Sequence, residues 1–388
     1  MSSLTRTQRL FFAAAFFSGL GFGPFQYLQS LFIAELGATP QQIGQVLGLS
    51  GLVGVVLFIP VSQQIDWLGR KRVIIWGWGI GAATTLAMAW APNWQWYIPA
   101  LILYRLSSLA MPAFYAYLAE TDTEGNPNRL FSLIAAASTI GVVISPLISG
   151  WLAEIFGLRA VFSYSALLFS LATVVFLAIP EQALTTRQER LPVQTLVKNR
   201  PLMGQMVFLF LFFFVIDLGQ IMVPNYLHDV HGVSYLQIGQ LGTIGAVGML
   251  LLTIFLGRLS AERQDVLFIT QFLALAALLL WLWTPTALGM MAAFFVHGTN
   301  RLAVPYANGR IALFLPARMR NLGFGFRETA VRLSFAAGPF VAGWLYGLDP
   351  QWPLIISGFG LMIMLVVTFF MPNGRLQTNT ARHPSTNR

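Results

Sequence analysis

The sequence of 388 residues contains no cysteine and few charged residues. The absence of cysteine excludes disulfide bonds and thiolate chemistry. Charged residues make up 10 % of the chain, whereas an ordinary soluble domain holds roughly 25 %. Hydrophobic residues make up 56 % of the chain. This composition indicates a protein that lies mostly within a lipid bilayer.

Sequence motifs of enzymes are also missing. The chain has no Walker loop for nucleotide phosphates, no Gly-x-Ser-x-Gly nucleophile elbow and no His-x-x-Glu-His pair. His228 and His231 are spaced like two metal ligands on one helix face, but Gly232 follows at once and no further ligands cluster nearby. The sequence therefore predicts a protein that is not an enzyme and that holds no metal and no cofactor.

Long apolar stretches recur along the whole chain. A helix that spans a bilayer needs about 20 residues, and irregular backbone is not tolerated there. We therefore predict an all-α integral membrane protein with twelve spans. These are 9–34, 41–65, 72–91, 95–119, 129–154, 158–179, 204–227, 235–258, 266–285, 287–312, 322–346 and 352–371.

The two halves of the chain repeat the same short motifs in the same order. QIGQ at 42–45 returns at 237–240, 195 residues later, and SPLISGWL from Ser145 returns as GPFVAGWL from Gly338, 193 residues later. Such repeats constrain the whole fold. We expect two pseudo-symmetric six-helix bundles, with domain bounds of 1–179 for the first bundle, 180–203 for a cytoplasmic loop, 204–371 for the second bundle and 372–388 for a cytoplasmic tail.

The distribution of cations predicts the orientation. Of the 23 Lys and Arg residues, 17 fall at the termini or in loops after even-numbered spans, and only Arg159 falls in a loop on the other side. The positive-inside rule then places both termini in the cytoplasm. The net charge of +9 mostly reflects this asymmetry, so nucleic acid is not an expected partner. We expect a multi-pass monomer of the plasma membrane, the inner membrane in a bacterium, whose surroundings are lipid.

Two motifs carry a family resemblance. The segment from Asp66 to Arg72, DWLGRKR, resembles the cytoplasmic signature loop of the major facilitator superfamily, with Trp67 in place of a basic residue. A second segment, from Gly141 to Gly150, is similar to a Gly-Pro pattern of the antiporter branches of that superfamily. The resemblance implies a secondary transporter that works by alternating access, closest in its motifs to the proton-coupled drug and metabolite exporters.

The resemblance also implies residues that switch the conformation. In the family, the carboxylate that corresponds to Asp66 pairs with the N-terminus of span eleven and with nearby arginines. Small residues let helices approach closely, so we expect the two halves to meet along faces of spans five and eleven. The expected switch residues are Asp66, Gly69, Arg70, Pro146, Gly150, Pro339 and Gly343.

Charged groups inside the membrane point to a binding site. An ionised side chain at bilayer depth costs about 2.5–3.5 kcal/mol on insertion scales, so it should face a cavity or a partner. Arg105, Asp217 and Arg301 fall on spans four, seven and ten, which together with span one line the central cavity in the superfamily. Polar residues share helical faces with them. The expected substrate-binding residues are Gln26, Gln29, Arg105, Tyr115, Asp217, Gln220, His297 and Arg301. Gln26 and Gln29 have an alternative role as hydrogen-bonding contacts between helices.

Asp217 is the expected proton-responsive group, with Arg105 and Glu328 as further coupling residues. Burial and a nearby arginine act in opposite directions on the proton affinity of a carboxyl group, so movement of an arginine would make protonation depend on conformation. The alternative is a permanent ion pair that only holds spans together. Glu328 and Arg332 stand at i and i+4, the favourable order for a pair on one helix.

The sequence predicts proton-coupled efflux of a small, fairly apolar molecule, with that molecule and protons as partners. The alternative is an importer or exchanger of the same fold for an organic anion or a sugar. Its motivation is that Arg105 and Arg301 outnumber Asp217 inside the spans.

Overall fold

The computed structural model describes residues 5–121, 127–181, 198–256, 264–284, 286–299, 307, 311, 315 and 320–370. Within these ranges the chain is helical and contains no β-strand. The side chains of 57–68 and 320–322 are among those outside the description.

Each predicted span contains one described helix or two or three consecutive ones. The first half has α1 (Arg6–Tyr27), α2 (Gln29–Glu35), α3 (Pro40–Leu68), α4 (Arg70–Ala89), α5 (Trp94–Ser107), the short helix η1 (Ser108–Ala110), α6 (Met111–Glu120), α7 (Pro127–Phe156) and α8 (Leu158–Leu177). The second half has α10 (Arg200–Gln220), α11 (Val223–His231), α12 (Tyr235–Leu256), α13 (Gln264–Trp283), α14 (Ala287–His297), α16 (Arg320–Leu348) and α17 (Trp352–Phe370). Eight of the described helical segments are long and apolar enough to cross a membrane.

Three of the predicted spans are interrupted close to a proline. Span one changes from α1 to α2 four residues after Pro24, span four passes through η1 before Pro112, and span seven breaks between α10 and α11 before Pro224. Proline removes a backbone donor and clashes with the preceding turn, so it bends or ends a helix. These three are among the four spans that the family resemblance assigns to the central cavity.

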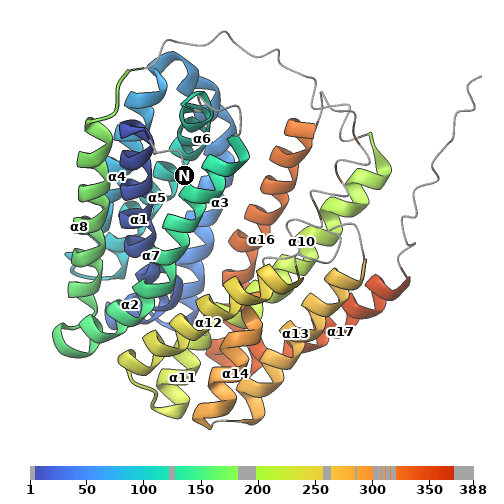
Figure 1. Cartoon of the computed structure of the whole chain (residues 1–388). Helices are drawn as coiled ribbons and strands as arrows, with labels where there is room; N and C mark the ends of the chain where they lie inside the picture. The colour runs from blue at the N-terminus through green and yellow to red at the C-terminus, as the bar shows by residue number, and fades with distance from the viewer. Residues whose placement is uncertain are drawn as a thin grey trace, which may run out of the picture.

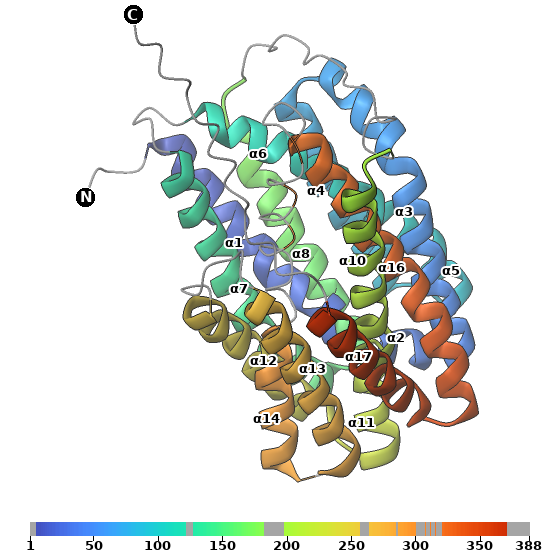
Figure 2. The ribbon, with the colours of Figure 1, turned by 90° about the vertical axis from the view of Figure 1, so that its right-hand side faces the viewer.

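Most helices pack against other helices of the same half of the sequence (Figures 1 and 2). In the first half α1 packs on α7 and α8, and α4 packs on α8. In the second half α10 packs on α16 and α17, and α13 packs on α14 and α17. Two extensive contacts join the halves, α3 with α16 and α7 with α12.

The sequence repeat has a local structural counterpart at the start of α3 and α12. Thr39 and Gln42 form a capping box, in which each side chain bonds the backbone N–H of the other residue. Ser234 and Gln237, 195 residues further on, form the same pair. Such reciprocal bonds satisfy N–H groups that a helix start leaves free. The repeated Gln of QIGQ therefore begins a helix in both halves.

The repeated glycines pack against each other across the halves. A Cβ atom built on Gly44, in the first QIGQ, would lie 3.1 Å from Gly343 Cα. A Cβ atom built on Gly239, in the second QIGQ, would lie 2.8 Å from Gly150 Cα. The predicted contact of spans five and eleven with the other half is therefore confirmed. Their partners are spans eight and two, which were not predicted from the sequence.

The molecule has two ends, and each end takes its name from a glycine in one of its loops. The Gly37 end holds the loops around Gly37, Gly157 and Gly232, all with positive φ. The Gly69 end holds the junction of α3 and α4 at Gly69, with φ of +80°. The glycine contacts between the halves lie toward the Gly37 end, because Gly44 is near the start of α3 and Gly343 is near the end of α16.

Candidate functional site

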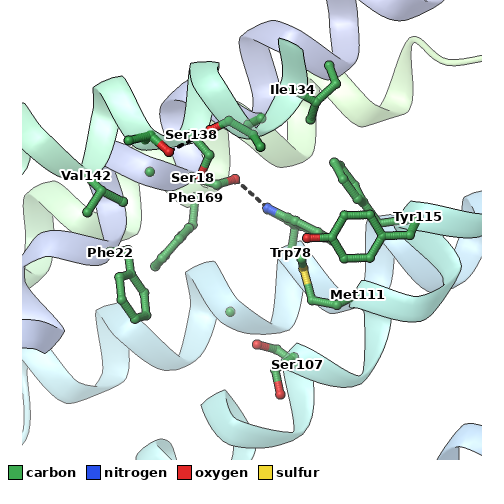
Figure 3. Close-up of a pocket in the computed structure, with 18 of the residues that line it drawn as sticks. Ser18, Phe22, Trp78, Ser107, Met111, Tyr115, Ile134, Ser138, Val142 and Phe169 are labelled. Carbon is green, nitrogen blue, oxygen red and sulfur yellow. Dashed lines mark hydrogen bonds between the residues drawn. The ribbon is translucent and has the colours of Figure 1, made fainter. Parts of the chain in front are cut away.

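A cavity of about 540 Å³ lies among the helices of the first half and is completed by two residues of the second half. Its walls come from α1, α4, α5, η1, α6, α7 and α8, with Met249 of α12 and Arg332 of α16. The volume falls within the range of small-molecule sites, roughly 300–1,000 Å³. Figure 3 shows Phe22 and Phe169 on one side of this space and Trp78 and Tyr115 on the other.

Close helix approach shapes one wall of the cavity. A Cβ atom on Gly77 of α4 would lie 3.0 Å from the carbonyl oxygen of Ser107, and a Cβ atom on Gly81 would lie 3.4 Å from the Ser107 hydroxyl. The small residues thus allow the junction of α5 and η1 to pack against α4. This packing brings Trp78 and Ser107 into the same cavity wall.

Most hydroxyl groups of the wall have partners within the protein. Ser107 and Ser108 donate to the carbonyls of Tyr104 and Arg105, each at 2.7 Å. The Trp78 indole donates to the Ser18 hydroxyl at 2.7 Å, as Figure 3 shows, and Ser18 in turn donates to a carbonyl of its own helix. These hydrogen bonds hold the polar side chains in place and use their donors.

Arg105 is the charged residue that α5 contributes to the cavity wall. Its side chain is exposed to the cavity, and no hydrogen bond or ion pair of its guanidinium occurs within the described part of the chain. The charges of Asp217 and Arg332 act on it through space. The cavity lining, so far as it is described, contains no Asp or Glu.

Arg332 brings a second guanidinium to the cavity from α16. Its Nε donates to Glu328 Oε1 at 3.2 Å, which confirms the predicted i, i+4 pair. Arg327 donates to the other carboxylate oxygen of Glu328, also at 3.2 Å. One carboxylate is therefore shared by two arginines. The side chain of Arg327 is only 12 % exposed, so Arg327 is held in this cluster.

The predicted residues of spans seven and ten form a separate group. His297 of α14 contacts the Gln220 side-chain oxygen of α10, and its ring centroid lies 5.0 Å from that of Trp281. Asp217 lies one turn before Gln220 and is 5 % exposed. Its Oδ2 is buried and has no hydrogen-bond partner among the described residues. Arg301, predicted for the same site, lies outside the described residues.

Asp217 is closely covered by α16. A Cβ atom built on Gly338 would lie 2.7 Å from Asp217 Oδ2, so a side chain at this position would force the carboxyl group to move. Gly338, which precedes the predicted switch residue Pro339, thus lies against the predicted proton-responsive group. The repeat of SPLISGWL as GPFVAGWL marked this segment in the sequence, but its contact with Asp217 was not predicted.

Of the predicted binding residues, Arg105 and Tyr115 line the cavity. Gln29 is buried and donates to the Tyr97 hydroxyl at 3.1 Å, which fits its alternative role as a contact between helices. Gln26 is exposed and donates to the hydroxyl of Tyr27 at 3.2 Å. Neither glutamine lies in the cavity wall. The wall residues Trp78 and Ser138, from spans three and five, were not predicted.

The signature loop is described in part. Asp66 lies in the last turn of α3, and its side chain is outside the description. Arg70 forms an ion pair with Glu120 at the end of α6 and donates to the Ala116 carbonyl at 3.5 Å. Arg70 therefore joins spans three and four, a partnership that was not predicted.

Comparison with known proteins agrees with this architecture. The model of the Major Facilitator Superfamily matches residues 11–299 and 221–387. The chain is 24 % identical over 337 residues to the multi-drug resistance efflux pump PmrA of Streptococcus pneumoniae, covering 82 % of the chain and 83 % of PmrA. It is 25 % identical over 365 residues to the multidrug resistance protein MdtH of Cronobacter sakazakii, covering 88 % of each.

Solved structures share the fold at lower identity. A structure of the nucleoside transporter NupG superposes with a TM-score of 0.79 at 17 % identity, covering 94 % of this chain and 99 % of NupG. A peptide transporter of the POT family superposes with a TM-score of 0.76 at 11 % identity, covering 93 % of each chain. The family match over most of the chain and the apolar helices show that this multi-pass membrane protein is a transporter, not an enzyme, and belongs to the Major Facilitator Superfamily.

Proposed function

We propose that the protein is a secondary active transporter that exports a small molecule in exchange for protons. The observation that carries this proposal is the buried carboxyl group of Asp217, whose Oδ2 has no hydrogen-bond partner in the described chain and which lies under Gly338 of α16. An ionisable group inside a membrane is a candidate for a proton pathway. Here that group contacts a helix that also contributes Arg332 to the cavity.

We further propose twelve spans in two six-helix bundles, with the domain bounds predicted from the sequence. The paired glycine contacts support this arrangement, since Gly44 with Gly343 and Gly239 with Gly150 are equivalent under the repeat. The positive-inside rule supports a cytoplasmic Gly69 end, because the signature-loop cations lie there. In this orientation both termini are cytoplasmic, and the protein lies in the plasma membrane as a monomer.

In this orientation the structure corresponds to a state closed on the outside. The halves pack tightly at the Gly37 end, where the carboxylate of Glu154 on α7 also accepts a hydrogen bond from the Leu236 N–H of α12 at 3.1 Å. Nearer the Gly69 end, a Cβ atom built on Gly325 of α16 would meet no atom of the described residues within 4 Å. Parallel repeats of this kind work by rocking of one half against the other around a central site.

Rocking would link the proton to the substrate through α16. The helix contacts Asp217 at Gly338, contacts α3 at Gly343 and brings Arg332 to the cavity. A shift of α16 relative to α10 would change the space around Asp217 and the distance between Asp217 and the arginines. The proton affinity of a carboxyl group depends on both. Export rather than import is supported by the relatives PmrA and MdtH, which are named for multidrug resistance.

The proposal is tested with purified protein in proteoliposomes that contain a pH-sensitive dye. Ligands are first selected by thermal shift from a panel of aromatic drugs, sugars and organic anions. We expect at least one stabilising ligand to dissipate an imposed pH gradient, and only in vesicles that contain the protein. If every stabilising ligand crosses the membrane without moving protons, the coupling proposal fails.

Replacement of Asp66 by Asn tests the expected conformational lock. We expect Asp66→Asn to shift the balance of inward-open and outward-open states several-fold while substrate binding persists, because Asp66 lies in the last turn of α3, at the Gly69 end. The measurement is accessibility labelling of single introduced cysteines, which is free of background since the chain has none. Asp265→Asn, at the start of α13, is the matched control. Unchanged labelling together with lost binding would argue against a lock.

A further inference from the structure

We infer that the cavity beside Arg105 binds an aromatic organic anion, with its carboxylate held by Arg105 and Arg332. This inference rests on the proposed transport function and adds the charge and shape class of the substrate. The relatives PmrA and MdtH are named for multidrug resistance, which leaves that class open.

The first argument is the state of Arg105. Its guanidinium lies in a membrane-spanning segment, is exposed to the cavity and has no hydrogen bond or ion pair in the part of the chain that the structure describes. An arginine at this depth needs water, a carboxylate or a ligand to offset its desolvation. Asp217 acts on it only through space and does not line the cavity.

The second argument is that a guanidinium reaches the cavity from each half of the chain. Arg105 comes from α5 and Arg332 from α16. Arg332 shares the carboxylate of Glu328 with Arg327, and its guanidinium also lines the cavity. A planar guanidinium presents paired N–H donors that match a carboxylate. A ligand carboxylate between the two arginines would contact both halves at once.

The third argument is that several polar side chains of the wall already donate within the protein. Ser107, Ser108 and Thr139 donate to carbonyls of their own helices, and the Trp78 indole donates to Ser18. These donors are therefore not available to the many hydroxyl groups of a sugar. The guanidinium of Arg105 has no such partner in the described part of the chain, and it selects for negative charge.

The fourth argument is the apolar remainder of the wall. Trp78, Tyr115 and Phe131 lie in the wall with Phe22 and Phe169, which Figure 3 places across the space from Trp78. Aromatic rings pack favourably against one another in offset or edge-on arrangements. The cavity of about 540 Å³ has room for a fused two-ring body. The combination favours an aromatic carboxylate over a cationic drug of the same size.

Binding of three probes of equal shape tests the inference. The probes are 2-naphthoate, 2-naphthamide and 2-naphthylmethylammonium, which are anionic, neutral and cationic. Affinities are measured by titration calorimetry on the purified full-length protein in lipid nanodiscs, at one pH and without any gradient. We expect 2-naphthoate to bind at least tenfold more tightly than 2-naphthamide, and the cation to bind most weakly.

Variants assign this preference to the two arginines. Arg105→Gln and Arg332→Gln should each reduce the preference for 2-naphthoate at least fivefold, while the affinity for 2-naphthamide changes less than twofold. Arg105→Lys keeps the charge and should retain part of the preference, which also guards against a folding defect in Arg105→Gln. Arg159→Gln is the control, because Arg159 donates to the Ala89 carbonyl and does not line the cavity.

Equal affinity for the anionic and neutral probes, or tighter binding of the cation, would overturn the inference. A preference that survives in both Arg105→Gln and Arg332→Gln would also overturn it. Because these experiments use no gradient, they are independent of proton coupling. Failure of the pH-gradient experiment with a preserved anion preference would remove the proposed function and leave the binding site.

Discussion

Asp217→Asn should abolish the accumulation of substrate driven by a pH gradient while leaving exchange at equal pH measurable. The amide has almost the same shape as the carboxyl group, so it fits the space under Gly338, where a Cβ atom would lie 2.7 Å from Asp217 Oδ2. It cannot bind and release a proton in the physiological range. The expected accumulation ratio falls to that of empty vesicles.

The same substitution separates coupling from a structural role. Asp217 is 5 % exposed, and the charge of Arg105 acts on it through space. If its role were a permanent ion pair, Asn would leave the arginine unpaired and lower the melting temperature together with transport. We expect the melting temperature to change by only a few degrees. Asp349→Asn, in the turn after α16, controls for removal of a carboxylate outside the spans.

A variant that still concentrates substrate on a proton gradient would remove Asp217 from the mechanism. Glu328 would then be the next group to test, by Glu328→Gln. Its substitution carries an additional structural effect, because Arg327 and Arg332 both bond its carboxylate at 3.2 Å. Glu328→Gln would remove the carboxylate that both guanidinium groups bond, so it should also reduce stability.

Gly150→Leu and Gly343→Leu should each prevent transport and lower stability. A Cβ atom on Gly150 would lie 2.6 Å from the Tyr235 carbonyl oxygen and 2.9 Å from Gly239 Cα. A Cβ atom on Gly343 would lie 2.9 Å from Gly44 Cα. These neighbours are backbone atoms, which cannot move aside as a flexible side chain can. Overpacking of this kind typically costs about 1–3 kcal/mol, and here it also forces apart the helices that join the halves.

Alanine and leucine at the same positions give a graded test. Gly343→Ala should already lower the melting temperature, because the Cβ atom alone is too close, and Gly343→Leu should lower it further. Gly204→Leu is the control, since a Cβ atom on Gly204 of α10 would meet nothing within 4 Å. Melting temperature and transport are measured for all variants in proteoliposomes. If both leucine variants keep the melting temperature and transport of the wild type, the α7–α12 and α3–α16 contacts tolerate separation. That result would contradict the prediction from the close glycine contacts.

Features that depend on spacing along one helix were predictable from the sequence. The apolar stretches predicted the spans, and each predicted span contains a described helix. This prediction was possible because the length of a hydrophobic run is a local property of the sequence. The pair of Glu328 with Arg332 was predicted correctly, since residues four apart on a helix are neighbours. The repeat of QIGQ was visible as letters, and its glutamines begin α3 and α12 in the same way.

Features that depend on how helices cross were decided by the tertiary structure. Nothing in the spacing of Gly44 indicates that it meets Gly343, or that Gly338 covers Asp217. The same holds for Arg70 with Glu120 and for Gln29 with Tyr97, which are 50 and 68 residues apart.

The cavity itself illustrates the difference. Charge in an apolar helix marked Arg105 as a site residue, because a cation within the membrane needs a cavity or a partner wherever the helix lies. Trp78 and Ser138 carry no charge, and they line the cavity only because α4 and α7 turn those faces toward α1 and α5. A sequence therefore determines which residues require a polar environment, whereas the packing of helices decides which apolar and hydroxyl side chains surround those residues.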